Sequence, residues 1–270
     1  LWWNVRPTHP VFVPYSVTSR TPILETDYNF HKSNSTYFSD LDISRTALVT
    51  RLYTPGIRTV SKELDAELGE AARREGKKPP AHKNMYVALG SVFCSFKREI
   101  KPFELYEIET KVIAWDRKWM YVLSFFLRPA KAGGKRSLFA TAVSKYVVKK
   151  GRLTVPPERV LRASGWLPER PEGDVLVADS PVEGSGVGTP AGEGITATAG
   201  VDGALVREVL KVSEGDMPET KLEEEKKANA ESWSVGEWTW EMIEEERQRG
   251  LEVVAGYINM DTKLHDEWER

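Results

Sequence analysis

The feature that most restricts the fold is a run of four strand-like segments in the middle of the chain. In Tyr106–Trp115 charged side chains alternate with apolar or small ones, as in a strand with one solvent-facing side. Trp119–Arg128 is almost wholly apolar, which indicates a central strand covered on both faces. Tyr86–Lys97 and Ser137–Val148 complete the run, and Val17–Thr26 is an earlier strand. Short turns join the four consecutive segments, so the sequence predicts an antiparallel sheet.

The segment between the first strand and this run has the periodicity of helices. Apolar side chains recur at helical spacing over residues 34–53, and Asn34 or Ser35 is suited to cap the first turn. We expect Pro55-Gly56 to end this helix, because proline removes a backbone donor and clashes with the preceding turn. A second amphipathic helix is expected over residues 57–74. A sheet that buries one face against a long helix is an α+β arrangement.

The polar loop that opens the first helix is the best candidate for a functional site. It reads Asp27-Tyr-Asn29-Phe-His31-Lys-Ser-Asn34 and continues to Tyr37. An Asp carboxylate can act as a general base on water or attack an acyl carbon directly. The free N–H groups of a first helical turn can stabilise an oxyanion, and Asn29 and His31 can orient substrate or water. Taken singly, Asp27 is more often a turn or cap residue, and His31 a structural hydrogen-bonding residue.

The string Asp27-x-Asn29-x-His31-x-x-Asn34-x-x-Tyr37, placed after a strand and at the head of a long helix, resembles the hot-dog fold thioesterases. The resemblance is to the 4-hydroxybenzoyl-CoA thioesterase-like branch, and within it to the thioesterase superfamily member six-like proteins of fungi and animals. The string is also similar to that of plant fatty acyl-ACP thioesterases. The resemblance covers roughly residues 17–165. Two features depart from the family pattern: Ser33 replaces an Asn, and the segment 57–84 is longer than usual.

The resemblance implies a hot-dog fold, in which a curved antiparallel sheet wraps around one long central helix. It also implies hydrolysis of an acyl-CoA or acyl-carrier thioester. Asp27 would be the general base or nucleophile, and His31 and Asn29 would position the reacting groups. Substrate binding falls to four residues at the helix start, of which the first three also supply oxyanion-binding amides: Ser33, Asn34, Ser35 and Tyr37. Family members pair as homodimers and bind the acyl group at the protomer interface.

The balance of charge divides the chain near Pro168. The net charge is −2, but the part up to Pro168 has 28 basic and 15 acidic residues, and the remainder has 10 basic and 25 acidic. The basic part suits coenzyme A phosphates, and no nucleic-acid partner is expected. We expect four regions: an N-terminal arm (1–16), a hot-dog domain with a helical insertion at about 57–84 (17–168), a mostly flexible linker (169–232), and an acidic, partly helical segment (233–270).

The acidic segment could bind an unknown partner or dock on its own basic domain. A capping box at Ser234-Val-Gly-Glu237 predicts a helix that ends at Gly250. No cofactor is implied, since coenzyme A is part of the substrate, and no Cys/His group has the spacing of a metal site. With Cys94 as its one cysteine and no readable signal peptide, we expect the chain to be cytoplasmic or to face the cytosol, with an upstream membrane anchor still possible. Two alternatives to an enzyme are a non-catalytic acyl-binding or scaffold protein on the same fold, and an interaction protein that acts through its acidic tail.

Overall fold

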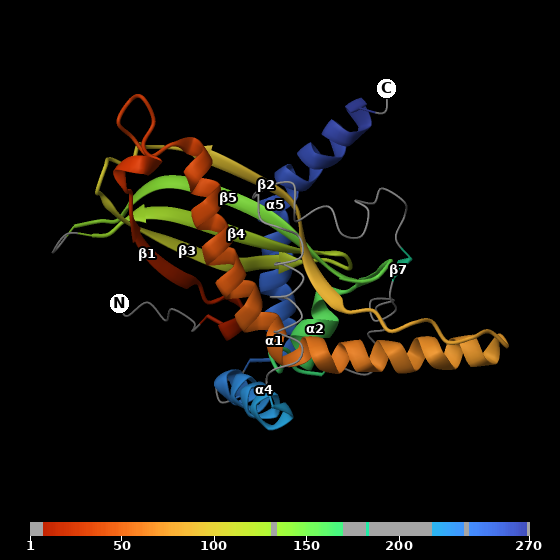
Figure 1. The fold of residues 1–270 in the computed structure, drawn as a ribbon. Coiled ribbons are helices and arrows are strands. Elements are labelled where there is room, and N and C mark those ends of the chain that lie inside the picture. The colour runs from red at the N-terminus through yellow and green to blue at the C-terminus, as the bar shows by residue number, and fades with distance from the viewer. Residues whose placement is uncertain (1–7, 131–133, 170–181, 184–217, 235–237, 269–270) are drawn as a thin grey trace.

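A curved antiparallel sheet wraps around the first half of one long helix, α1 (Asn34–Arg74), as Figure 1 shows. The computed structural model describes residues 8–130, 134–169, 182–183, 218–234 and 238–268. The strands are β1 (Tyr15–Arg20), β2 (Met85–Phe96), β3 (Leu105–Trp115), β4 (Trp119–Arg128), β5 (Ser137–Lys150), β6 (Leu153–Val155) and β7 (Val182–Glu183). Their order is β1-β3-β4-β5-β6-β7, and β2 pairs with β5 on the side away from β4. This is the expected hot-dog arrangement, with C-terminal helices added to it.

The remaining helices lie around this central unit. They are the 3₁₀ turns η1 (Pro10–Phe12) and η2 (Ile23–Glu25) and the helices α2 (Pro157–Ala163), α4 (Glu219–Ser234) and α5 (Trp240–Trp268). α2 and α4 pack against α1, while α5 covers the outer face of the sheet. Among the described residues, no helix has both the length and the apolar character needed to cross a membrane.

The core lies between α1 and the concave face of the sheet. Leu41, Leu48 and Leu52 of α1 are completely buried there, with Val112 and Val122 of the sheet opposite them. Burial of one such side chain contributes about 1.5–3 kcal/mol relative to exposure. This apolar stripe holds the first turn of α1 in a constant position against the sheet.

Pro55 does not end the first helix, which corrects the expectation from sequence. α1 continues without interruption to Arg74 but bends sharply, and its second half projects away from the sheet (Figure 1). Pro55 has no N–H to donate to the Arg51 carbonyl, and its ring displaces the preceding turn, so carbonyl groups of this turn can accept from donors outside the helix. Residues of the α2 segment are close to these groups: the Trp166 Nε1–H donates to the Leu52 carbonyl (3.1 Å) and the Ser164 hydroxyl lies 3.5 Å from the Tyr53 carbonyl. Contacts between residues that are far apart in the sequence therefore stabilise the bend.

Gly250 does not end the last helix either. α5 passes through it because the helix approaches β3 so closely that a Cβ atom at Gly250 would lie 1.8 Å from the Ile113 carbonyl oxygen. Glycine permits this close approach. The Arg247 guanidinium donates to the Trp115 carbonyl beside it (2.6 Å). The acidic C-terminal helix thus docks on its own domain, the second of the two possibilities left open by the sequence.

The expected linker, residues 169–232, falls largely outside the described residues. Its last part forms α4, which is anchored to the domain: Leu222 is buried, the Asn229 amide donates to the Ser164 carbonyl (2.9 Å), and the Trp233 indole donates to the Gly165 carbonyl (2.8 Å). Of the expected arm, residues 1–7 are not described, while Val11 and Phe12 lie in the core.

Strand positions agree with the sequence within a few residues, except at the first strand. β1 ends at Arg20, six residues before the predicted end at Thr26. Pro22 explains the difference, because proline cannot donate to the ladder, and the chain turns into η2. β6, a three-residue strand after Gly151, was not expected; Gly151 has φ +60°, which makes the tight turn from β5 possible.

Candidate active site

Asp27 organises the loop between η2 and α1. Its Oδ1 accepts hydrogen bonds from the backbone N–H groups of Asn29 (2.9 Å) and His31 (3.3 Å). Its own N–H donates to the His31 carbonyl (2.8 Å), and Phe30 takes a left-handed conformation with φ +58° to complete the turn. Among the described residues Oδ2 has no hydrogen-bond partner. One carboxylate oxygen therefore holds the loop, and the other is available to a water molecule or a substrate.

This loop forms one wall of a cavity of about 610 Å³ at the start of α1. Five of the seven residues predicted for the site line it: Asp27, Asn29, His31, Asn34 and Tyr37. Ser33 and Ser35 do not line it; their hydroxyl groups lie 3.0 Å from each other. The other lining residues are Lys32 and a group from the ends of β2 and β4 and the β2–β3 connection: Phe96, Lys97, Arg98, Glu99, Lys101 and Arg128.

The three amides expected to bind an oxyanion are not equivalent. The Ser33 N–H donates to the Glu25 carbonyl (2.7 Å), so it is already engaged within the loop. Asn34 and Ser35 are the first two residues of α1, where N–H groups have no acceptor within the helix. Their amides, together with the positive end of the helix dipole, remain the donors that could stabilise negative charge.

The His31 ring is held from outside the loop. Its Nε2 lies 3.2 Å from Glu99 Oε2, on the connection that follows β2. The imidazole is partly buried, with 28% of its side-chain surface exposed, whereas Asn29 and Asn34 are exposed. A carboxylate that accepts a hydrogen bond from one ring nitrogen fixes the orientation of an imidazole. Glu99 could therefore set how His31 is presented to a substrate.

Lys32 is a structural element of the site that sequence reasoning missed. The side chain has no exposed surface, and its Nζ lies 2.6 Å from Glu25 Oε2 and 3.0 Å from Asp40 Oδ2. The Tyr106 hydroxyl also donates to Asp40 Oδ2 (2.6 Å). A buried ammonium group needs such partners. Lys32 thus joins the loop to α1, and nothing in the local sequence distinguishes it from an exposed loop lysine.

Tyr37 lies at the base of the cavity with 2% of its surface exposed. Its ring contacts the rings of Phe96 and Phe126, with centroids 5.0 and 4.8 Å away. Burial, reinforced by neighbouring acidic groups, raises the pKa of Tyr37 well above its ordinary value of 10. The phenol therefore stays protonated at neutral pH and can donate a hydrogen bond to a bound ligand.

Basic side chains surround the cavity opening. Lys97, Arg98 and Lys101 are exposed, and among the described residues none of them has an ion-pair partner. Both the Lys97 and Arg98 N–H groups donate to the Phe139 carbonyl (2.7 and 3.0 Å), which fixes the backbone of this segment on β5. Arg128 differs, because it pairs with Glu104 at 2.7 Å. Three unpaired cations at one opening favour an anionic group of a ligand.

A helix wrapped by a curved sheet, with an Asp loop at the start of the helix, is the architecture of the hot-dog thioesterases. The chain belongs to the thioesterase-like superfamily, whose family model (4HBT_2) matches residues 21–164. It is 36% identical over 264 residues to thioesterase lcsJ of Purpureocillium lilacinum, an alignment that covers 96% of this chain and 72% of that protein. It is 33% identical over 276 residues to thioesterase poxG of Penicillium oxalicum (94% and 70%). It is 37% identical over 177 residues to the probable thioesterase atnL of Emericella nidulans (59% and 56%).

Among the described residues there is no group of three or more His, Cys, Asp or Glu side chains that could hold a metal ion. The candidate site instead consists of a carboxylate, helix N-terminal amides, an imidazole and a phenol. These groups can activate water and stabilise an oxyanion by hydrogen bonds and fixed dipoles.

Proposed function

We propose that the protein hydrolyses an acyl-CoA or acyl-carrier thioester to a free acid and a thiol. The observation that carries this proposal is the geometry of Asp27, whose Oδ1 is engaged by the loop while Oδ2 has no partner among the described residues, at the start of α1. Membership of the thioesterase-like superfamily and the names of its relatives support the reaction class.

Asp27 can act in one of two ways. As a general base it takes a proton from water, whose oxygen attacks the acyl carbon. As a nucleophile its carboxylate attacks that carbon, and water hydrolyses the resulting anhydride. In both cases the carbonyl oxygen becomes an oxyanion, for which the amides of Asn34 and Ser35 are the proposed donors. The carbon–sulfur bond then breaks, and the thiolate leaves and takes up a proton.

The surrounding residues suit a ligand of this kind. His31, oriented by Glu99, and Asn29 would position the acyl group or the attacking water. The cations Lys97, Arg98 and Lys101 would contact phosphate groups of coenzyme A or of a phosphopantetheine carrier. We further propose that the protein acts as a homodimer, because β2 is an edge strand that has no partner on its outer side among the described residues.

Hydrolysis of a panel of acyl-CoA substrates, and of acyl groups on a carrier protein, tests the proposal. Asp27→Asn should lower kcat by at least 10²-fold, while Glu70→Gln, an exposed change on the projecting half of α1, should leave the rate unchanged. Equal rates for Asp27→Asn and the wild type would refute the role of Asp27. If the wild-type protein binds acyl-CoA but releases no thiol with any substrate, the alternative of a non-catalytic acyl-binding protein is correct.

A further inference from the structure

The helix α5 crosses the outer face of the sheet from β3 to the edge strand β2. In its third turn the Arg247 guanidinium donates to the Trp115 carbonyl on β3 (2.6 Å). Ten residues later the Tyr257 hydroxyl lies 2.6 Å from Ser91 Oγ on β2. Three strand-to-strand steps of about 4.8 Å separate β3 from β2, and ten residues of helix at about 1.5 Å each cover the same distance. α5 therefore reaches the edge of the sheet near Tyr257.

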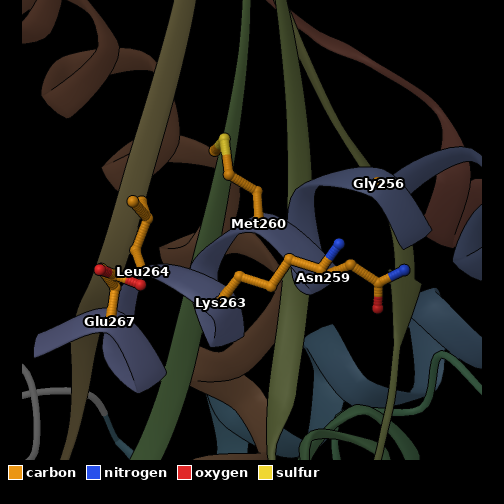
Figure 2. A pocket seen from close by; sticks show the side chains of 6 residues that line it. All are labelled: Gly256, Asn259, Met260, Lys263, Leu264 and Glu267. Carbon is orange, nitrogen blue, oxygen red and sulfur yellow. The ribbon is translucent and has the colours of Figure 1, made fainter. Parts of the chain in front are cut away.

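The rest of α5, Asn259–Trp268, extends past this edge and is called the α5 overhang below (Figure 1). Its large apolar side chains follow one another at intervals of four residues, and each is exposed: Met260 38%, Leu264 65% and Trp268 81%. A hollow of about 600 Å³ follows this flank, and only α5 residues line it, as Figure 2 shows: Gly256, Asn259, Met260, Lys263, Leu264 and Glu267. In the described part of the chain no sheet residue lines this flank.

In the part of the sheet that the structure describes, the strand at this edge, β2, is paired on one side only. β2 pairs with β5 and, among the described residues, with no other strand. Its 12 residues, Met85–Phe96, contain no charged residue and no proline, two of the means by which proteins protect an exposed strand edge, although the strand has a register irregularity between Leu89 and Ser91. Phe93 lies on the α5 side of β2, two residues after Ser91, and is 44% exposed. Within the described part of the chain, both the backbone edge of β2 and part of its outer face are therefore uncovered.

We propose that the α5 overhang packs against a second copy of this chain across paired β2 edges. This inference rests on the dimer suggested under the proposed function. It adds the α5 overhang as an element that holds the two copies together, and this contact is called the clasp below. If two β2 strands pair antiparallel about a two-fold axis, the sheets become continuous, and each overhang points across the axis over the outer face of the other copy. Its ten residues span about 15 Å, enough to pass over the partner's β2 and β5 at about 4.8 Å per strand.

A second copy fits this surface better than a lipid membrane does. Within the described residues each copy has an apolar flank that no other element covers and, at the same edge, a partly exposed apolar side chain on β2, Phe93, so a two-fold axis could cover both at once. The flank also carries one cation, Lys263, and one anion, Glu267, in adjacent turns. A flank that binds anionic lipid would instead be predominantly basic.

Sedimentation velocity of the full chain tests the clasp without any substrate, so its outcome is independent of catalysis. Leu264→Glu places a charge on the proposed contact, and it should raise the dimer dissociation constant at least tenfold. Thr262→Glu is the matched control, because it adds the same charge on the other side of the helix and should change the constant less than twofold. Both residues are exposed, so neither variant should lose its fold; circular dichroism checks this.

A photo-crosslinking amino acid provides a second, direct readout. Placed at position 264 of a tagged copy mixed with an untagged copy, it should crosslink the two chains, and placed at position 262 it should not. Three results would overturn the proposal: a chain that stays monomeric at all concentrations, equal dissociation constants for Leu264→Glu and Thr262→Glu, or crosslinks from position 264 that stay within one chain.

Discussion

The ammonium group of Lys32 lies 3.0 Å from the carboxylate of Asp40, and this contact joins the candidate active-site loop to the first helix. Lys32 also pairs with Glu25 at 2.6 Å, so one buried cation connects the segments before and after the Asp27 turn. The Asp27 carboxylate depends on this connection for its position, although Lys32 contacts Asp27 through no hydrogen bond in the described structure.

We expect Lys32→Met to lower both stability and hydrolysis. The Asp40 side chain is only 12% exposed, and the variant leaves it without its ammonium partner. Loss of one member of a buried pair costs about 3–5 kcal/mol. Because Glu25 is partly exposed, we expect a loss of about 2–4 kcal/mol in the free energy of unfolding. Urea unfolding measures this loss. Lys62→Met, which removes an exposed pair with Glu219, should have a much smaller effect, because solvent screens a pair of this kind. Equal losses in the two variants would contradict the structural role of Lys32.

Two helical glycines should respond to alanine in opposite directions. Gly250→Ala would place a Cβ 1.8 Å from the Ile113 carbonyl oxygen, so α5 must shift away from the sheet at a cost of about 1–3 kcal/mol or more. Gly69→Ala meets no atom within 4 Å, and alanine should stabilise the helix by about 0.5–1 kcal/mol. Thermal unfolding of both variants checks the prediction, and a Gly250→Ala protein as stable as the wild type would show that α5 does not dock as described.

His9 should make the protein less stable in mild acid. The side chain is fully buried between the rings of Trp233 and Trp238, and burial lowers its pKa from 6.5 to about 4. Between these values the unfolded chain binds a proton that the folded chain does not, so stability falls as pH falls from about 6.5 to about 4. At 1.4 kcal/mol for each pKa unit, the total is about 2–4 kcal/mol.

The control for this effect is His9→Asn, whose side-chain oxygen can replace Nδ1 as the acceptor for the Val11 N–H (3.2 Å) but does not titrate. From pH 7 to pH 4.5 the unfolding free energy of the wild type should fall more than that of His9→Asn. The wild type therefore loses stability relative to the variant as the pH falls. A difference that does not change with pH would show that His9 is not the titrating group.

The basic opening of the cavity should determine affinity for a phosphorylated carrier. A Lys97→Glu/Lys101→Glu double variant should raise KM for acyl-CoA at least tenfold and change kcat less than threefold, because the reversed charges repel phosphate without touching the reacting atoms. Added salt should raise the wild-type KM by screening the same attraction. Lys77→Glu/Lys78→Glu, an equal charge change on the exposed segment after α1, serves as the control. Identical KM values in the two double variants would place the phosphate groups elsewhere.

The sequence by itself determined the four long strands β2 to β5, the start of α1 and the site loop. Alternation and apolar runs are local properties, and they located β3 and β4 within one residue. The polar string from Asp27 to Tyr37 identified five residues that do line one cavity. Prediction succeeded here because each pattern depends on neighbours in the chain.

The tertiary structure decided the features that depend on distant partners. Pro55 stays inside a helix because Trp166 reaches the Leu52 carbonyl, and Gly250 stays inside a helix because α5 lies directly on β3. Lys32 is buried because Asp40, in the second turn of α1, and Glu25 neutralise it. Local preference disfavours each of these placements, and packing between segments far apart in the chain supplies the free energy that outweighs it.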